Sequence, residues 1–294
     1  MFKHYIFYNP TAGYGHKLDE IRELANRSEE TVLYDVTKSE GASALENLDS
    51  TDKVTVCGGD GTLNRFLNSG IDFPCDVYYY PSGTGNDFMR EVSESMEHPE
   101  DGKIKPAKIN GYIKDLPTVR VRAEGKDIEA KFINGVGYGI DGYCCEEGDA
   151  LRESGATNIN YTSIAIKGLL FRYKPTDATV TVDGKEYRFR KVWLAPVMKG
   201  KYYGGGMIPT PEQKRDSGEL SVLVFHGSGK LKTLMIFPSI FKGEHTKSKK
   251  NVTVLSGKEI SVKYDSPRPL QIDGETVKMA EYYEAYAKLP VSAE

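Results

Sequence analysis

The sequence predicts two domains, an N-terminal α/β domain over residues 1–114 and an antiparallel β domain over residues 115–279. Two patterns lead to this prediction. Up to Lys114, short apolar runs of β-forming residues alternate with segments of helical periodicity, as in a parallel sheet covered by helices. Beyond Lys114, short alternating runs follow one another between turn residues, which is typical of antiparallel sheets.

The composition is that of a globular protein without a strong charge imbalance. Charged residues make up 28% of the 294 residues, hydrophobic ones 39%, and the net charge is −3, so we expect no nucleic-acid partner. No apolar segment approaches the roughly 20 residues that span a bilayer, and the first residues lead into a strand rather than a signal peptide. We therefore expect a cytoplasmic protein. The four cysteines form no CxxC pair, which argues against a disulfide framework or a zinc site.

The first domain begins with a strand at residues 4–8, a loop of small residues and a helix from about residue 17 to 26. The same alternation continues with a strand at 31–34, a helix at 41–48, a strand at 54–57 and a helix, then a strand at 77–80 and a helix. Three strands thus end in loops of glycine and small polar residues, at 9–13, 58–62 and 81–87. Because ligands of parallel sheets gather beyond the carboxyl ends of the strands, we expect these loops to form one nucleotide site.

The central loop has the sequence Gly58-Gly59-Asp60-Gly61-Thr62. Glycines permit positive φ and close approach to a ligand, and a helix start presents N–H groups to an anion. We expect Thr62 to cap that helix. No Walker lysine motif occurs, so amides and a metal ion would balance the charge of a phosphate. Asp60 suits such a crevice if it holds Mg²⁺ or polarises an acceptor, and capping a helix is its alternative role.

Polar side chains of the two flanking loops are further candidates for nucleotide binding. These are Asn9, Thr11, Thr84 and Asn86. Each is an ordinary turn residue, yet at the end of a strand it offers the hydroxyls and amides that a nucleotide needs. Asp87 can equally cap the helix that follows it.

In the second domain, two predicted helices interrupt a series of short strands. The strands are expected at 118–121, 128–134, 179–182, 187–193, 220–225, 252–255, 260–264 and 270–272. The helices are expected at 160–171 and at 231–241, the second bent near Pro238. The Tyr-rich C-terminal segment, 280–294, is expected to return to the first domain.

Two Asp-Gly dipeptides lie between alternating strands, which is a strong hairpin signal. Asp183-Gly184 has no functional neighbours, so we interpret it as a bare turn. Asp273-Gly274 is followed by Glu275, and a phosphoryl-transfer site needs a carboxylate that orients a hydroxyl and accepts its proton. Asp273 is therefore a catalytic candidate, with a simple turn as the alternative.

For three further stretches, both a functional and a purely structural interpretation are open. Residues 215–220 can form a hard-cation site or a solvated turn before a strand. The glycines of 202–207 permit close approach to a ligand. Residues 241–250 form a basic patch, which is either a solvated surface or attracted to anionic lipid headgroups.

Taken in order, these motifs resemble the diacylglycerol kinase catalytic family in its soluble bacterial form, which is similar to sphingosine kinases and, more distantly, to NAD kinases and phosphofructokinases. The resemblance rests on 9–13, 58–62, 81–88, 132–137, 204–207, 216–220 and 273–275. It implies an N-terminal nucleotide-binding domain of the NAD kinase/phosphofructokinase-like three-layer type and a C-terminal antiparallel β-sandwich. It also implies that ATP and a lipid hydroxyl meet between the two.

The resemblance also implies roles for individual residues. Asp273 would be the general base with Glu275 supporting it, and Asp60 would lie near the phosphates and Mg²⁺. Nucleotide would be bound by Asn9, Thr11, Gly58, Gly59, Gly61, Thr62, Thr84 and Asn86. A structural Mg²⁺ would be held by Asp216, Ser217 and the Leu220 carbonyl, but the family commonly has an acidic residue at the position of Ser217, and a hydroxyl is a poorer ligand.

The expected function is an ATP- and Mg²⁺-dependent lipid kinase that converts diacylglycerol or a related lipid to its phosphate, phosphatidic acid in the case of diacylglycerol. The alternatives are a kinase of a soluble acceptor such as NAD and a catalytically inactive regulator that binds nucleotide or lipid. We expect peripheral contact with the inner membrane surface. A homodimer is expected from the resemblance.

Overall fold

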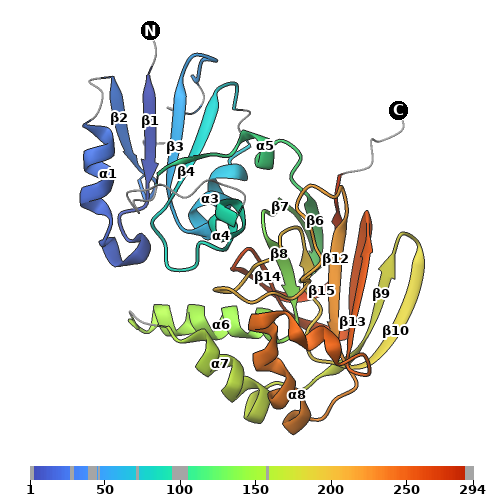
Figure 1. Cartoon of the computed structure of the whole chain (residues 1–294). Helices are drawn as coiled ribbons and strands as arrows, with labels where there is room; N and C mark the ends of the chain where they lie inside the picture. The colour runs from blue at the N-terminus through green and yellow to red at the C-terminus, as the bar shows by residue number, and fades with distance from the viewer. Residues whose placement is uncertain are drawn as a thin grey trace. The chain divides into compact units, whose positions relative to one another are not determined.

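The computed structural model describes residues 3–26, 30–38, 45, 47–70, 73–94, 105–156 and 159–288. The chain divides into two compact units, residues 1–115 and 116–294 (Figure 1). Residues 41–44 and 46 of the helix expected at 41–48 lie outside the described residues. No helix among the described residues is long and apolar enough to cross a membrane.

The first unit contains a five-stranded sheet in the order β2-β1-β3-β4-β5. Its strands are β1 (His4–Tyr8), β2 (Thr31–Asp35), β3 (Lys53–Gly58), β4 (Asp76–Pro81) and β5 (Ala107–Lys108). The first four pair in parallel, as predicted, whereas β5 pairs antiparallel with β4. The sequence did not reveal β5 because two residues are too few to show a period.

Helices cover both faces of this sheet. They are η1 (Ala12–Gly15), α1 (Leu18–Ala25), α3 (Asp60–Leu67), α4 (Asp87–Glu94) and the short α5 (Asn110–Ile113). Neighbouring residues of β1 point to opposite faces: Ile6 packs with Ile21 of α1, while Phe7 contacts Phe66 of α3 with ring centroids 5.6 Å apart. The predicted three-layer α/β architecture is confirmed.

The second unit is built on antiparallel strands in the order β13-β12-β11-β8-β14-β15-β6-β7, with the β9–β10 hairpin joined through β14. The strands are β6 (Thr118–Ala123), β7 (Lys126–Lys131), β8 (Gly135–Tyr138), β9 (Thr176–Val182), β10 (Lys185–Val192), β11 (Val197–Met198), β12 (Leu220–Phe225), β13 (Val252–Gly257), β14 (Glu259–Ile272) and β15 (Glu275–Tyr286). One large core lies against the sheet and contains buried residues such as Val180, Val222 and Tyr283.

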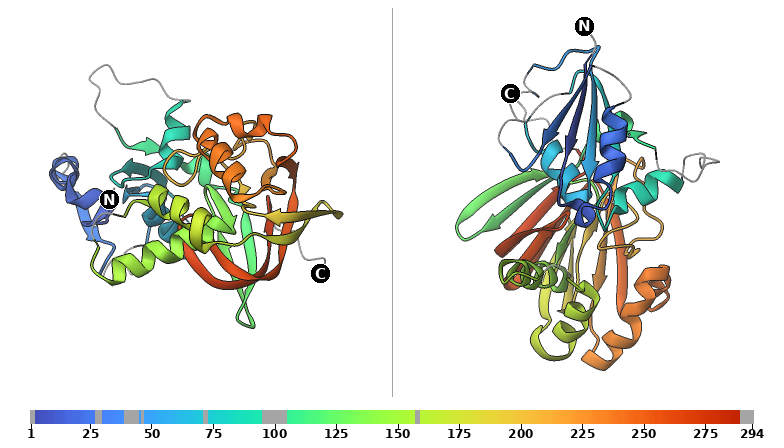
Figure 2. Two further views of the ribbon diagram at one scale, coloured as in Figure 1. Left: turned by 90° about the horizontal axis from the view of Figure 1, so that it is seen from below. Right: turned by 90° about the vertical axis from the view of Figure 1, so that its left-hand side faces the viewer.

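The helices of the second unit pack on a smaller core around Trp193 and Phe225. Figure 2 shows the ribbons of these helices from two further sides. They are α6 (Ile140–Glu153), α7 (Tyr161–Lys167), the π-helical turn η2 (Gly168–Arg172), α8 (Lys230–Ile236), η3 (Phe237–Lys242) and η4 (Glu244–Lys247). The two predicted helices are confirmed, and the second changes from α to 3-10 geometry beside Pro238. The sequence did not reveal α6, because few of its residues are apolar and no regular apolar stripe marks it.

The expected return of the C-terminal segment to the first domain is wrong for its described part. Residues 280–286 belong to β15, which pairs with β14 and β6 in the second unit. Tyr283 and Ala285 are fully buried in the large β core, and this burial fixes the strand there. Residues 289–294 lie outside the described residues.

Candidate functional site

In the first unit, the loops that follow β1, β3 and β4 lie side by side at the carboxyl ends of these strands. Asn9 N donates to Cys57 O over 3.0 Å, and Ser82 N donates to Gly58 O over 2.9 Å. The side chains also meet, since Asn9 Nδ2 lies 3.3 Å from Thr62 Oγ1. The three stretches that the sequence singled out are therefore one continuous surface of backbone and small polar groups.

Gly58 and Gly83 in these loops are required by space rather than by backbone angle. A Cβ on Gly83 would lie 2.4 Å from Gly59 Cα, and one on Gly58 would lie 2.4 Å from Thr62 Cβ. Gly58, Gly59 and Gly61 are not among the glycines with positive φ. The positive φ expected of these three glycines is thus wrong. The close approach that the structure shows is between the second and third loops, and the expected approach to a ligand stays a prediction.

Asp60 caps a helix, but not the helix that it begins. Its Oδ2 accepts a hydrogen bond from Asp87 N at 2.7 Å and its Oδ1 accepts one from Phe88 N at 3.2 Å, at the first turn of α4. The N-cap of its own helix α3 is Gly59, so the expected capping by Thr62 is wrong. The carboxylate of Asp60 therefore joins the second loop to the third. It also places a negative charge at the N-terminus of α4, where the helix dipole favours an anion.

Three other candidates for nucleotide binding, Asn9, Thr11 and Asn86, also stabilise the loops. Asn9 Oδ1 accepts from Thr11 N and Thr11 Oγ1, at 3.0 and 2.8 Å. Asn86 adopts a left-handed conformation with φ 42° and donates from Nδ2 to Gly83 O over 2.7 Å. Thr84 is exposed at the tip of its loop. These contacts preorganise the loops, and the first N–H groups of α3, which have no acceptor within the helix, begin at the same place.

Lys17 is a candidate that the sequence analysis missed. Its Nζ donates to Pro81 O over 3.0 Å and lies 5.2 Å from the centre of the Tyr80 ring. It thus brings a positive charge to the end of β4, next to the loops. The local signal was its position shortly after the 9–13 loop, and it was interpreted only as the start of a helix. A lysine at this edge can supply part of the charge that a Walker lysine supplies elsewhere.

In the second unit, Asp273 forms the β14–β15 turn with φ 47°, and Gly274 follows with φ 94°. The predicted hairpin is confirmed. Its carboxylate accepts three backbone N–H groups, from Ile133 at 2.6 Å, Asn134 at 2.8 Å and Gly135 at 2.9 Å. Because a carboxylate has about four acceptor positions, the backbone uses most of them.

Arg215 contacts the same segment from the other side. Its guanidinium donates to Ile133 O and, over 3.1 Å, to Asn134 Oδ1. The peptide group between Ile133 and Asn134 therefore accepts from a cation and donates to the carboxylate of Asp273, and each bond polarises the other. The sequence analysis treated Arg215 only as the beginning of a loop, because nothing local links it to a segment 82 residues away.

Asp183, interpreted as a bare turn, has the same arrangement. It has φ 46°, and its Oδ1 accepts from Lys258 N and Glu259 N, both at 2.9 Å. The interpretation as a turn is right, but the carboxylate also holds the β13–β14 connection. Asp183 is exposed, whereas Asp273 is partly buried.

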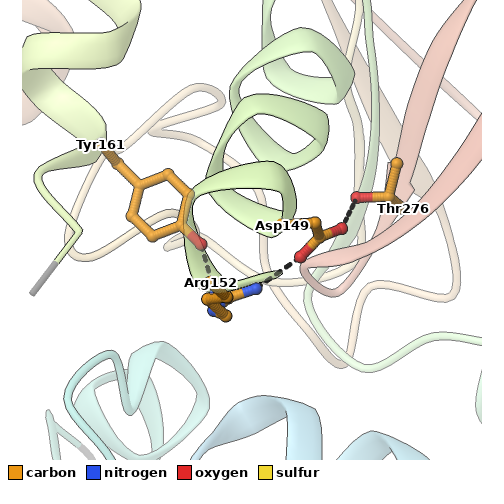
Figure 3. A network of polar contacts seen from close by, with 4 residues as sticks. All are labelled: Asp149, Arg152, Tyr161 and Thr276. Carbon is orange, nitrogen blue, oxygen red and sulfur yellow. Dashed lines mark hydrogen bonds and ion pairs between the residues drawn. The ribbon is translucent and has the colours of Figure 1, made fainter. Parts of the chain in front are cut away.

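Glu275 is partly buried at the start of β15, beside a polar network that joins this strand to α6 (Figure 3). The adjacent Thr276 donates from Oγ1 to Asp149 Oδ2 over 2.6 Å, and Asp149 forms an ion pair with Arg152. Arg152 also donates to Tyr161 OH at the start of α7. The network anchors both helices to the strand that carries Glu275.

Two of the three residues expected to hold a structural Mg²⁺, Asp216 and Ser217, are exposed, and a magnesium site there stays a prediction. The Ser217 hydroxyl is hydrogen-bonded to Glu219 N over 3.2 Å. The carbonyl oxygens that converge in this loop surround the buried Gln213 amide: its Nε2 lies 3.0 Å from Lys214 O, 3.0 Å from Glu219 O and 3.3 Å from Lys199 O. Leu220 opens β12 and is fully buried.

Within the described residues, no cluster of three or more His, Cys, Asp or Glu side chains suits a metal ion. The three carbonyl oxygens around the Gln213 amide are not the oxygens expected to hold the cation, which are those of Asp216, Ser217 and Leu220.

A buried carboxyl group lies beside the glycine loop of residues 202–207. Tyr203 OH donates to the carboxyl group of Asp141, 3.0 Å from each oxygen. Burial raises the pKa of Asp141 to about 7, although the bond from Tyr203 opposes the shift. The positive φ angles of Gly204, Gly205 and Gly206 turn the chain so that Tyr203 reaches it. Through Tyr203, this loop therefore contacts the first turn of α6 within the second unit.

Comparison with protein families gives two matches that together cover most of the chain. Residues 3–118 match the diacylglycerol kinase catalytic domain. Residues 134–286 match the YegS C-terminal NAD kinase beta sandwich-like domain. The first match contains the three glycine loops, and the second contains the Asp273 hairpin.

Individual relatives are distant. A diacylglycerol kinase of Mycobacterium tuberculosis H37Rv is 28% identical over 197 residues, which are 66% of this chain and 62% of that protein. A Bacillus subtilis protein named "Putative lipid kinase YtlR" is 25% identical over 295 residues, covering 92% of this chain and 93% of the relative. A crystal structure of a diacylglycerol kinase from Bacillus anthracis superposes with a TM-score of 0.59 at 19% identity, over 97% of this chain and 93% of that one. The structural likeness supports the fold.

Proposed function

Because the chain belongs to the diacylglycerol kinase catalytic family, we propose that it is a lipid kinase that transfers the γ-phosphoryl group of MgATP to a lipid hydroxyl. Diacylglycerol is the proposed acceptor, and phosphatidic acid would then be the product. Mg²⁺ enters this proposal as part of the nucleotide substrate.

The observation that carries the proposal is the packing of the three loops in the first unit. Gly83 and Gly59 approach so closely that no side chain fits between them, and Asp60 fixes the third loop from the second. The result is a rigid surface of backbone groups at the carboxyl end of a parallel sheet, which is where such sheets bind nucleotides. Lys17 adds a positive charge at its edge. This arrangement suits a polyphosphate better than a neutral ligand.

The proposed reaction is an in-line displacement. The acceptor oxygen forms a bond to the γ-phosphorus while the bond from that phosphorus to the β–γ bridging oxygen breaks, and ADP leaves with the bond's electron pair. The hydroxyl proton passes to the carboxylate of Asp273, which orients the attacking oxygen. The transition state needs positioning and charge neutralisation, for which preorganised amides and Lys17 are suited.

The proposal is tested by transfer of labelled γ-phosphate from ATP in the presence of Mg²⁺. Acceptors are offered in mixed detergent micelles: diacylglycerol beside monoacylglycerol, sphingosine and phosphatidylglycerol, with NAD in solution. A labelled lipid product supports the proposal and identifies the acceptor. Label on NAD alone would establish a kinase of a soluble acceptor, and ATP binding without any product would favour a regulator.

A pair of glycine variants tests the nucleotide loops. Gly83→Ala places a methyl group against Gly59 Cα, so it should raise the KM for ATP by about tenfold or more as the loops separate. Gly111→Ala in α5 is the matched control, because an added Cβ there meets no atom within 4 Å. Equal KM values for the two variants would remove the loops from the nucleotide site.

A further inference from the structure

Among the described residues of the second unit, the three large apolar side chains with the highest exposed fraction lie on two helical segments. Phe171 in η2 is 75% exposed, and Leu231 and Met235 in α8 are 76% and 74% exposed. We call the outer surface formed by these three residues the apolar helical face. Large apolar side chains that are three-quarters exposed are unusual when they occur together, and they indicate a contact surface.

Helix α8 presents its apolar side chains outward and a polar one inward. Leu231 and Met235 are four residues apart, so they lie on one side of the helix. Thr233 is fully buried on another side, where its hydroxyl lies 2.6 Å from Ser228 Oγ and donates to Gly229 O over 3.1 Å. Packing within the unit therefore does not explain Leu231 and Met235.

The two segments are held together. Lys230 Nζ, at the start of α8, donates to Leu170 O in η2 over 2.7 Å. Phe171 and Leu231 directly follow these two residues in the chain. The views in Figures 1 and 2 agree that α7 and α8 lie next to each other at one end of the unit. The exposed side chains thus belong to one surface.

The charged residues of the two segments that form this surface are all cationic. Residues 159–176 and 220–243 contain no Asp or Glu, although the whole chain has a net charge of −3. They contain six cationic residues, which are Lys167, Arg172, Lys174, Lys230, Lys232 and Lys242. The acidic residues of α6, such as Glu147 and Glu153, border the surface on the side of α7. A second copy related by a two-fold axis would place these six cations against six others, which disfavours a dimer through this face.

We propose that the apolar helical face docks on the surface of an anionic lipid membrane. Phe171, Leu231 and Met235 would enter the boundary between headgroups and acyl chains, and the surrounding lysines and arginine would contact lipid phosphates. The proposal rests on a lipid acceptor, as in the proposed function, and adds the surface by which the protein reaches it. The basic stretch at 241–250 is a weaker candidate, because Lys247 pairs with Glu244 and His245 is buried.

The test is flotation of the full chain with unilamellar vesicles, without nucleotide or acceptor. The wild type is expected to bind vesicles of phosphatidylcholine with 30% phosphatidylglycerol, chosen for the assay, and to bind pure phosphatidylcholine at least about tenfold more weakly. The double variant Leu231→Ser/Met235→Ser should lose about tenfold or more of its binding to the anionic vesicles. The matched control is Leu33→Ser/Ile128→Ser, which removes two exposed apolar side chains elsewhere and should bind like the wild type.

Insertion is measured separately with Leu231→Trp. Trp193 is buried, so a shift of the emission to shorter wavelength on adding anionic vesicles, with quenching by brominated lipid, reports the new residue. Equal vesicle binding by the two double variants, or an unshifted emission, would overturn the proposal. So would light scattering in which Leu231→Ser/Met235→Ser converts a dimer to a monomer while vesicle binding is unchanged.

These results are independent of catalysis. If no lipid is phosphorylated but the vesicle results are as expected, the function fails and the docking surface stands. If both double variants phosphorylate micellar diacylglycerol equally and bind vesicles equally, the docking surface fails and the function stands.

Discussion

Asp183 and Asp273 occupy the same position in two hairpins of one unit, and they differ mainly in what their carboxylates hold. Both have left-handed φ angles and a glycine next in the chain. Asp183 is exposed and accepts two backbone N–H groups from the connection before β14. Asp273 is partly buried and accepts three, from the segment that leads into β8.

The comparison shows that a carboxylate fixed by backbone amides is not by itself a sign of catalysis. What distinguishes Asp273 is its surroundings: the segment it holds is polarised from the far side by Arg215, and Glu275 follows in the chain. Asp183 is therefore an internal control with the same local geometry, and the predictions below use it to separate structural from catalytic effects.

The largest expected effect is on turnover. Asp273→Asn should lower kcat for the lipid acceptor by about 10³-fold, because an amide cannot accept the hydroxyl proton, whereas Asp183→Asn should change kcat by less than about twofold. The measurement is steady-state transfer of labelled phosphate, with the KM for ATP expected to stay within about twofold in both variants. If Asp273→Asn retains most of the wild-type kcat, Asp273 is a structural residue like Asp183.

The second effect is on folding. Asparagine offers one acceptor oxygen and points an NH₂ group at backbone donors, so Asp273→Asn should lower the free energy of unfolding by about 3 kcal/mol. Asp183→Asn should lower it by about 1 kcal/mol, because water can replace the lost acceptor at an exposed turn. Urea unfolding measures both. Turnover of Asp273→Asn must accordingly be measured below its unfolding transition, and equal destabilisation of the two variants would contradict the difference in burial.

The two hairpins also show which features of the structure can be predicted from the sequence. Both turns are predictable, because the Asp-Gly signal depends on adjacent residues. The partners of the two carboxylates are not, since Asp183 contacts residues 75 and 76 positions away and Asp273 contacts residues 138 to 140 positions away. The same applies to Asp60, whose helix-capping role was foreseen but whose partner is the start of α4, 27 and 28 positions later.

The grouping of the three glycine loops is predictable for a different reason. The alternation of strands and helices fixes a parallel sheet, and a parallel sheet brings the ends of its strands to one edge. The topology thus predicts that the three loops are neighbours, although they lie far apart in the sequence. No such rule predicts the roles of Lys17 and Gln213, because these depend on which carbonyl oxygens the folded chain places next to each side chain.

Asp141 differs from both hairpin carboxylates, because its hydrogen-bond donor is the Tyr203 hydroxyl rather than backbone N–H groups. Burial raises the pKa of Asp141 to about 7, above the value of 3.8 expected in the unfolded chain. Its proton therefore stabilises the fold at low pH, and this stabilisation is lost progressively as pH rises from about 4 to about 7. Relative to Asp141→Asn, the wild type should lose about 2 to 3 kcal/mol of unfolding free energy between pH 5 and pH 8.

Unfolding of the two proteins in parallel at each pH tests this, because all other groups titrate alike in both. Asp273→Asn is the control. It should stay less stable than the wild type from pH 5 to pH 8, whereas Asp141→Asn should gain stability relative to the wild type as pH rises. A difference between the wild type and Asp141→Asn that is constant from pH 5 to pH 8 would show that the carboxyl group titrates normally.

The smallest expected effect concerns the loop that Arg215 joins to the Asp273 segment. The carbonyl oxygens of Lys214, Glu219 and Lys199 already receive the Gln213 amide, so a metal ion has little to gain there. Without nucleotide, millimolar Mg²⁺ should shift the Tm of the wild type by less than about 1 °C relative to EDTA. Gln213→Ala removes the donor and leaves buried oxygens without partners, so it should be less stable and should respond to Mg²⁺ more than the wild type does. A rise of several degrees in the Tm of the wild type with Mg²⁺ would contradict this prediction and show that the loop binds a cation. Asp216 would then be the first ligand to replace.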